Sequence, residues 1–211
     1  MLKTPRRSSA SRTRAQRLLA AVLRYSAAIV AQVKGTLFVD YVRMLRAKKG
    51  ADWARYLSPT DLDYLNQHIE PNGWYPMATF ERMGVAILAE VAQGDLDLVR
   101  EWGRYSIDWL CAQHPNLVAH GDPCETLMRF QVQRQSFFDY PSLTMREIHD
   151  GGAMVVIAYG MCDRAEEAAS HQTLGFFQRL LEVSGAKNVR VGFNSRSWNG
   201  EADTVLFMDW E

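Results

Sequence analysis

Cysteine is scarce in this chain of 211 residues, so a disulfide framework is excluded as a source of its stability. Cys111, Cys124 and Cys162 form an odd, sparse set, which is typical of proteins in a reducing compartment. Long apolar runs are also missing, because the nearest candidate for a membrane span, 18–33, contains Arg24 and falls short of about 20 uninterrupted apolar residues. We expect a cytoplasmic protein whose thiols are buried as small apolar side chains.

Catalytic motifs are absent as well. The sequence contains no Gly-x-Ser-x-Gly turn, no glycine-rich phosphate loop and no His-Glu-x-x-His run. Ser170 and His171 are adjacent, but a catalytic triad is a spatial arrangement that adjacency along the chain does not indicate. These absences favour a binding protein over an enzyme.

Positive charge is concentrated at the start of the chain, although 24 Lys and Arg residues balance 24 Asp and Glu residues overall. The first acidic residue is Asp40, so the chain from Ala31 onward is net acidic. Residues 1–13 are basic, serine-rich and without hydrophobic periodicity, which predicts a disordered arm. They lack the apolar core of a secretory signal.

Several arginines in and just after this arm are candidate contact residues. They suit the phosphates of nucleic acid or of an anionic membrane, or an acidic protein surface, and a solvated tail without a partner is the alternative. Too few aromatic residues lie between them for base stacking. The composition therefore favours a protein contact or no role for Arg6, Arg7, Arg12, Arg14 and Arg17.

Residues 14–33 have apolar side chains at helical spacing. The stripe consists of Leu18, Val22, Tyr25, Ile29 and Val33. A helix with such an apolar stripe needs a surface to pack on. We therefore predict a docking helix over 14–33, followed by a domain that spans 34–211.

The sequence of the first two-thirds of the domain predicts helices that are separated by turns. Ser58 before Pro59, with an acid at Asp61, is a typical helix start, and the turn at 71–73 ends that helix. Asp122 marks another start. Further helices are expected at 37–48, 77–92, 96–113 and 122–139.

The hydrophobic period changes after residue 140. Alternating or apolar stretches predict strands at 143–148, 154–159, 189–193 and 205–210, with a helix at 164–183 between the second and third strands. Glycines at 151, 152 and 200 mark tight turns. The sequence therefore predicts an α+β fold, in which a helical subdomain precedes a ββαββ, mostly antiparallel, four-stranded sheet with a helix on one face.

Four stretches carry a family resemblance: Val33-Lys34-Gly35-Thr36-Leu37-Phe38, Gly73-Trp74-Tyr75-Pro76, Arg100-Glu101-Trp102-Gly103 and Leu180-Leu181-Glu182-Val183-Ser184-Gly185-Ala186. In this order they resemble the H-NOX-like superfamily. That group includes heme nitric-oxide/oxygen sensor domains, four-vinyl-reductase-type sensors and Bet3-type vesicle-tethering subunits, and the chain is most similar to a set of its myxobacterial paralogues. The resemblance covers residue 33 to the C-terminus and implies an H-NOX-like sensor or adaptor.

The resemblance also implies how heme would be held, and the sequence departs from that pattern. Heme sensors of this group carry a proximal histidine ahead of a Tyr-Pro pair. Tyr140-Pro141 is present here, but the matching position is near Gln133, and no histidine lies between His120 and His149. Without an axial ligand, iron is not held in that geometry.

A second departure concerns the heme propionates, which the group's sensors bind with a Tyr-x-Ser-x-Arg run. The comparable stretch here is Tyr159-Gly160-Met161-Cys162-Asp163-Arg164, where the serine is absent and the arginine is displaced by one residue. We therefore expect a protein without heme.

The cysteine and histidine positions bear on two kinds of zinc site. The four-vinyl-reductase-type sensors place cysteines around their last hairpin, and the corresponding residues here, 197–203, include none. A different set, Cys111-x2-His114-x5-His120-x3-Cys124, offers four tetrahedral zinc ligands at an unfamiliar spacing. The alternative for this set is two buried thiols and two solvent-facing histidines.

Many aromatic residues are expected between the helices and the sheet, where they form either a solid core or the wall of a ligand cavity. They are Phe80, Trp102, Tyr105, Trp109, Phe130, Phe137, Phe138, Tyr159 and Phe176. The pocket that we predict for a small apolar ligand is lined by Trp102, Tyr105, Trp109, Met128, Phe137 and Tyr159.

Two functions remain open at this point. The first is a non-catalytic sensor or adaptor that binds a small apolar ligand or a protein partner without heme. The second is a structural assembly module with a solid core, like the Bet3-type relatives, that docks through 14–33 as a dimer or hetero-complex. An apolar void above about 300 Å³ favours the first, and a filled core with an exposed apolar stripe favours the second.

Overall fold

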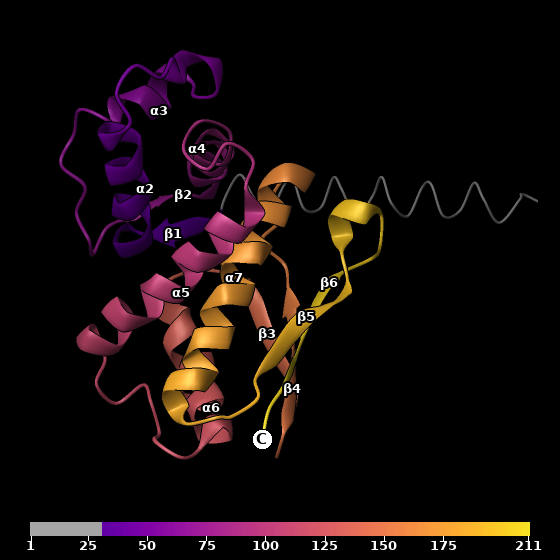
Figure 1. The fold of residues 1–211 in the computed structure, drawn as a ribbon. Helices are drawn as coiled ribbons and strands as arrows, with labels where there is room; N and C mark the ends of the chain where they lie inside the picture. Colours follow the sequence, from indigo (N-terminus) through magenta and orange to yellow (C-terminus); the bar gives the residue numbers. More distant parts are fainter. Residues whose placement is uncertain (1–30) are drawn as a thin grey trace, which may run out of the picture.

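The computed structural model describes residues 31–211, so the predicted arm 1–13 and most of the predicted helix 14–33 lie outside the described residues. A helical part is followed by an antiparallel sheet backed by helices (Figure 1). The elements are β1 (Gln32–Lys34), α2 (Gly35–Ala47), α3 (Pro59–Asp63), β2 (Trp74–Pro76), α4 (Met77–Glu90), α5 (Leu96–Gln113), α6 (Pro123–Gln133), β3 (Leu143–His149), β4 (Gly152–Ile157), α7 (Asp163–Ser184), β5 (Arg190–Ser195) and β6 (Thr204–Asp209).

The last residues of the predicted docking helix form a strand instead. β1 pairs antiparallel with β2, with Val33 opposite Tyr75, and a bridge joins Val33 to Phe138. Val33 is fully buried, and Ala31 is buried as well. Pairing with β2 therefore overrides the helical periodicity at Val33, and the domain begins at least three residues before the predicted boundary at 34.

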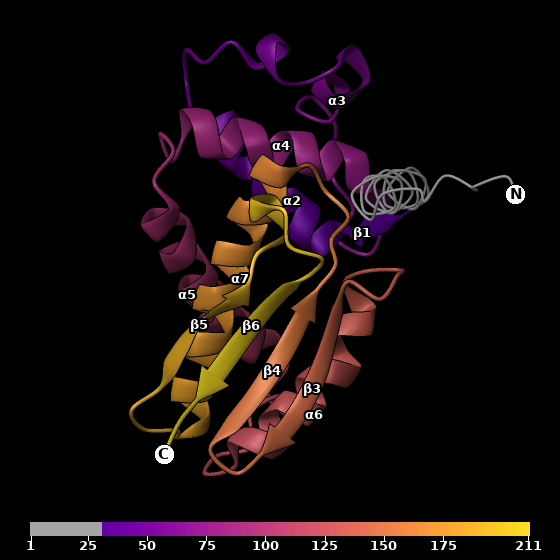
Figure 2. The ribbon, with the colours of Figure 1, turned by 90° about the vertical axis from the view of Figure 1, so that its right-hand side faces the viewer.

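Strands β3 to β6 form one antiparallel sheet in the order β3-β4-β6-β5 (Figure 2). The α+β fold predicted from the sequence is thus confirmed. Met145 lies opposite Val155, and Val155 lies opposite Leu206, so these three side chains form a row on one face. All three are buried, because successive strand residues point to opposite faces and this face meets the helices.

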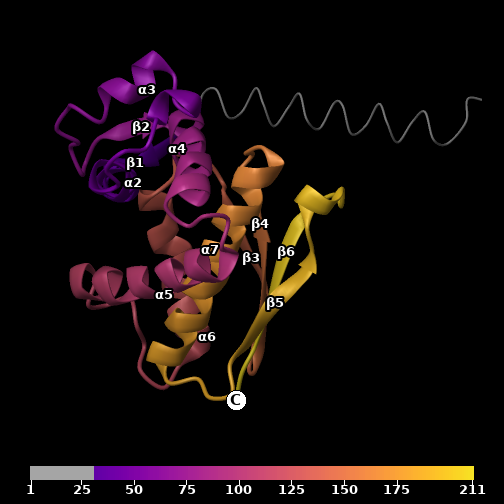
Figure 3. The same cartoon turned by 45° about the horizontal axis from the view of Figure 1, so that its top comes forward.

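Helix α7 lies against the inner face of the sheet and contacts α4, α5 and α6 (Figure 3). Phe177, Leu180 and Leu181 on α7 are fully buried. The helix ends as predicted at Gly185, whose φ of 102° is in the left-handed region that glycine adopts without a steric penalty. α7 therefore holds the helical part and the sheet together.

The turn from α3 to α4 is fixed by one buried carboxylate. Ser58 caps α3 as predicted and forms a capping box with Asp61. Asp61 is 1% exposed and accepts hydrogen bonds from the Arg82 guanidinium, at 2.7 and 2.8 Å, and from the Thr79 hydroxyl, at 2.7 Å. The predicted extent of this helix is wrong, because α3 already ends at Asp63.

Helix α6 begins as predicted but does not continue to residue 139. It ends at Gln133 and passes into a 3₁₀ turn, Arg134–Ser136. The chain must leave the helix there, because Phe138 bridges to Val33 and the Asp139 N–H donates to the Gln32 carbonyl. Among residues 31–211, no helix combines the length and the apolar character that crossing a membrane requires.

Candidate ligand cavity

A cavity of about 180 Å³ lies where the helical part meets the sheet. Its wall comes from α2, α4, α5, α6, α7, the start of β3, and the segments around 137–138 and 159–161. The wall is mainly apolar, and eight of its 18 residues are aromatic: Tyr41, Phe80, Trp109, Phe130, Phe137, Phe138, Tyr159 and Phe176. Such a wall binds apolar molecules, because it gains little from contact with water.

Two hydrogen-bonded tyrosine hydroxyls add polar groups to the wall. The Tyr41 hydroxyl donates to Gln172 Oε1 at 3.2 Å, and the hydroxyls of Tyr159 and Thr173 lie 2.6 Å apart. Burial raises the pKa of both tyrosines well above the usual range, so both phenols stay neutral at physiological pH. The wall thus offers neutral hydrogen-bonding groups rather than phenolate charge.

Among residues 31–211, Asp40 is the only formally charged side chain in the cavity wall. Its side chain is 57% exposed and pairs with Arg43 at 3.1 Å, which places it at the solvent side. Burial of its remaining surface raises the pKa of Asp40, and the pairing with Arg43 opposes that change. The described part of the chain contributes no lysine, arginine or histidine to the wall, and so no cationic group for an anionic ligand.

Half of the predicted pocket residues line this cavity. Trp109, Phe137 and Tyr159 are in its wall, and the other three are not. Tyr105 is 70% exposed and Met128 is 48% exposed, so both point to solvent. Trp102 packs instead against a small apolar cluster that contains Leu88 and Val99. The prediction is therefore wrong for Trp102, Tyr105 and Met128, because periodicity along a helix does not fix which stripe faces the cavity.

Sequence reasoning missed the polar part of the wall. Tyr41, Gln172 and Thr173 come from α2 and α7, and no motif singles them out. Tyr41 stacks on Phe80 with a centroid distance of 4.1 Å. The only available signal was the apolar stripe of α2, on which Tyr41 follows Phe38 by three residues.

The four candidate zinc ligands do not assemble a site. Within residues 31–211, no three His, Cys, Asp or Glu side chains are grouped closely enough to hold a metal ion. Cys124 Sγ contacts the His149 carbonyl at 3.3 Å, and His114 Nε2 lies 3.4 Å from the Gln133 amide. Burial raises the pKa of both Cys111 and Cys124, which favours the thiol over the metal-binding thiolate.

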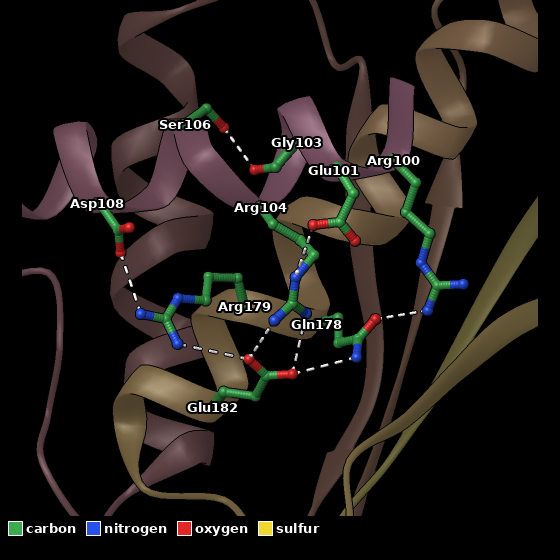
Figure 4. A network of polar contacts seen from close by, with 9 residues as sticks. All are labelled: Arg100, Glu101, Gly103, Arg104, Ser106, Asp108, Gln178, Arg179 and Glu182. Atoms are coloured by element: carbon green, nitrogen blue, oxygen red, sulfur yellow. Dashed lines mark hydrogen bonds and ion pairs between the residues drawn. The ribbon is translucent and has the colours of Figure 1, made fainter. Parts of the chain in front are cut away.

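Beside the cavity, α5 is attached to α7 by a polar network (Figure 4). Arg104 donates to both carboxylate oxygens of Glu182, at 3.0 and 2.9 Å, and Gln178 donates to the same carboxylate. Arg179 links Glu182 to Asp108. Burial opposes ionisation of Glu182, but the hydrogen bonds and charge of Arg104, together with hydrogen bonds from Gln178 and Arg179, outweigh burial and lower the pKa of Glu182. The network holds together two helices that both line the cavity.

Neither the protein-family models nor the curated proteins include a match to this chain. Solved structures do match. A T. tengcongensis H-NOX mutant shares 15% identity at a TM-score of 0.55, covering 84% of this chain and 97% of that one. The fold is that of the H-NOX proteins. An S. oneidensis H-NOX protein in the Fe(II)NO ligation state shares 13% identity at a TM-score of 0.56, with 84% and 99% covered. An unliganded Fe(II) H-NOX protein from K. algicida gives 14% and 0.56, with 84% and 96% covered.

The cavity of this H-NOX-like chain does not fit heme. Residues 31–211 place no histidine or cysteine in the wall, and the hydroxyls of Tyr41 and Tyr159 are already hydrogen-bonded and neutral. The same residues place no cationic side chain there to bind the propionates. The volume of about 180 Å³ also falls below the roughly 300 Å³ at which pockets for drug-sized ligands begin.

Proposed function

We propose that this protein is a non-catalytic sensor or adaptor domain that binds a small, uncharged apolar molecule without heme. The observation that carries this proposal is the cavity of about 180 Å³ between the helical part and the sheet. Apolar cavities of about 150 Å³ bind molecules of the size of benzene. The volume of this cavity is below the roughly 300 Å³ named above as the mark of a cavity for a drug-sized ligand. The proposal is therefore restricted to a ligand of about one aromatic ring with one or two polar substituents.

The polar groups of the wall support a neutral ligand that makes hydrogen bonds. Gln172 and Thr173 are neighbours on α7, and each already contacts a tyrosine hydroxyl of the wall. A phenol or an indole would place its ring among the aromatic side chains and its single polar atom beside these groups. An anionic ligand would meet only the negative charge of Asp40.

The test is a titration of the purified full chain with benzene, phenol, indole and benzoate, followed by NMR and thermal unfolding. We expect the neutral rings to bind and to raise the unfolding temperature by mass action, and benzoate not to bind. Ala169→Leu adds volume to the wall and should weaken binding at least about tenfold, whereas Ala112→Leu on the exposed side of α5 should not. Stoichiometric heme uptake with a Soret band, or no binding of any ring, would overturn the proposal.

A second candidate, the assembly module, is supported by apolar side chains on the surface of α5. Leu98, Tyr105 and Trp109 are all more than a third exposed and fall on one side of the helix. Under this alternative, sedimentation of the full chain would show an oligomer that Tyr105→Asp dissociates. A monomer that binds the neutral rings would favour the sensor.

A further inference from the structure

The face of the sheet that points away from α7 is apolar at its centre. Met154 lies opposite Phe207, and Val156 lies opposite Val205, so these four side chains form a block across the two central strands. These four residues, together with Thr144 and Arg146 of the neighbouring strand β3, form a surface that we call the outer face. The alternation along β4 and β6 places all four block residues on the side opposite the buried row.

Helices α5, α6 and α7 do not cover the outer face, and its four block residues are partly exposed. Figure 2 shows the sheet in front and helices α5, α6 and α7 behind it. None of the four block residues belongs to either apolar cluster of the described chain. The Phe207 ring lies over Gly192, where an added Cβ would be 2.6 Å from Cε1. A solvated face of an antiparallel sheet is normally polar, so an apolar block here indicates a surface that something covers.

We propose that residues 14–30 of the same chain dock on the outer face as an amphipathic helix. The position of the first described residues fits this docking. The Gln32 N–H donates to the Asp139 side chain at 2.7 Å, four residues before β3 starts. The Ala158 N–H donates to the Ser142 carbonyl and extends the ladder at the same end of the sheet. Residues 14–30, which precede Ala31 in the chain, would therefore connect to the domain beside one end of the outer face.

The proposed helix and the strands of the outer face also match in length. Residues 14–30 would form a helix of about 25 Å. Strand β3, with seven residues, is about 24 Å long. A helix that starts beside Leu143 and runs along the strands would therefore reach the turn between β3 and β4, and its stripe of Leu18, Val22, Tyr25 and Ile29 would cover the apolar block.

The proposed helix and the end of the sheet that it would reach also carry opposite charges. Residues 1–30 contain seven Lys and Arg residues and no acid, so the rest of this neutral chain carries a net charge of −7. A helix in the proposed direction brings Arg14 and Arg17 to the turn between β3 and β4. Glu147 and Asp150 are located there, and neither takes part in an ion pair within residues 31–211. Asp209, at the same end, already pairs with Arg190 at 3.2 Å.

The experiment is amide hydrogen exchange on the full chain. We expect the amides of 16–30 to exchange about tenfold more slowly in the wild type than in Phe207→Asp, because the charge would be buried under the docked helix. Val132→Asp is the matched control, since Val132 is 72% exposed on α6, and it should leave the protection of 16–30 unchanged. Fast exchange of 16–30 in the wild type, or equal loss of protection in the control, would overturn the proposal.

A second variant avoids any effect on the folding of the sheet. Val22→Asp lies in the segment itself, so the described fold stays intact, and we expect the Met154 methyl resonance to shift toward its position in a chain truncated before residue 31. An unchanged Met154 resonance would contradict docking.

Protection of residues 16–30 that rises with protein concentration would assign the outer face to a second copy, and protection that requires anionic vesicles would assign the segment to a membrane surface. Either outcome would also overturn docking within one chain.

Discussion

Gly103 on α5 and Gly175 on α7 each face the backbone of the other helix. A Cβ added at Gly103 would lie 1.9 Å from the Gln172 carbonyl oxygen, and one added at Gly175 would lie 1.9 Å from the Arg100 carbonyl oxygen. No real Cβ approaches a carbonyl oxygen this closely, so neither position accepts a side chain without separating the helices. The close crossing places Gln172 and Thr173 beside Ser106 in the cavity wall.

We therefore expect Gly103→Ala and Gly175→Ala each to lower the free energy of unfolding by about 3 kcal/mol or more, as overpacked cores do. Gly84→Ala is the control, because its Cβ would be 3.4 Å from the Tyr41 ring, an ordinary contact. That variant should gain up to about 1 kcal/mol from helix propensity. Urea unfolding of the three variants measures the difference, and equal effects at all three positions would disprove the backbone contact.

The buried carboxylate of Asp61 predicts a pH dependence of stability. Burial alone would raise its pKa, but hydrogen bonds from Arg82, Ser58 and Thr79 outweigh this and hold the pKa well below the usual range. A depressed folded-state pKa contributes stability above the unfolded pKa of about 3.9, and that contribution is lost as the pH falls toward the folded value. Asp61→Asn should cost about 3 kcal/mol at pH 7, and the gap to wild type should narrow below about pH 4. The exposed Asp63→Asn variant should follow the wild-type curve.

The Arg104–Glu182 pair should contribute measurably to stability because it is bidentate and only about a quarter exposed, with side-chain exposures of 24% and 27%. We expect Arg104→Ala to cost about 1–2 kcal/mol. The Arg190–Asp209 pair is 77% and 46% exposed, so Arg190→Ala should cost less than about 0.5 kcal/mol. A double-mutant cycle of Arg104 with Glu182 checks that the loss comes from the pair, and a coupling energy near zero would contradict it.

We also expect the stability of the tip of the β5–β6 hairpin to depend on pH, because His171 contacts it. Its ring lies 5.3 Å from Phe193 and 6.4 Å from Trp198, which belongs to the 3₁₀ turn Ser197–Asn199. Burial lowers the His171 pKa; Glu167 and Asp97 oppose this, and Arg100 and Arg196 add to it.

A folded-state pKa below the unfolded value of about 6.5 means that His171 contributes stability above that pH and loses it as the pH falls further. The Trp198 indole N–H should therefore exchange faster at pH 5 than at pH 7 after correction for the intrinsic rate. His171→Phe should remove this dependence while keeping the ring contact. If the variant and the wild type respond equally to pH, another group controls the tip.

The sequence predicted those parts of the fold that local chemistry determines. The turn at Gly151, with φ of 83°, and the end of α7 at Gly185 were recognised because glycine alone adopts such angles without strain. Ser58 and Asp122 were recognised as helix caps, and both side chains accept the expected backbone N–H bonds. These features depend on a few neighbouring residues.

Features that depend on distant residues were not predictable. β1 and β2 have three residues each, too few for a periodic pattern, and Val33 is held in place by Tyr75 and Phe138. The cavity wall likewise combines residues from six elements, and its polar members appear only when α7 is packed against α2. The aromatic character of the wall followed from composition, whereas the outward direction of Tyr105 and Met128 did not.

Three consecutive residues of α7 face two different environments. Gln172 and Thr173 line the cavity, while His171 contacts the tip of the β5–β6 hairpin. An α-helix turns as a rigid unit over such a short distance, because its backbone hydrogen bonds join each residue to the fourth one along. A ligand that rotates α7 by a few degrees would consequently move the His171 imidazole relative to Trp198. Ligand binding in the cavity would in this way change the structure of the hairpin tip at the surface, with no flexible segment needed between the two places.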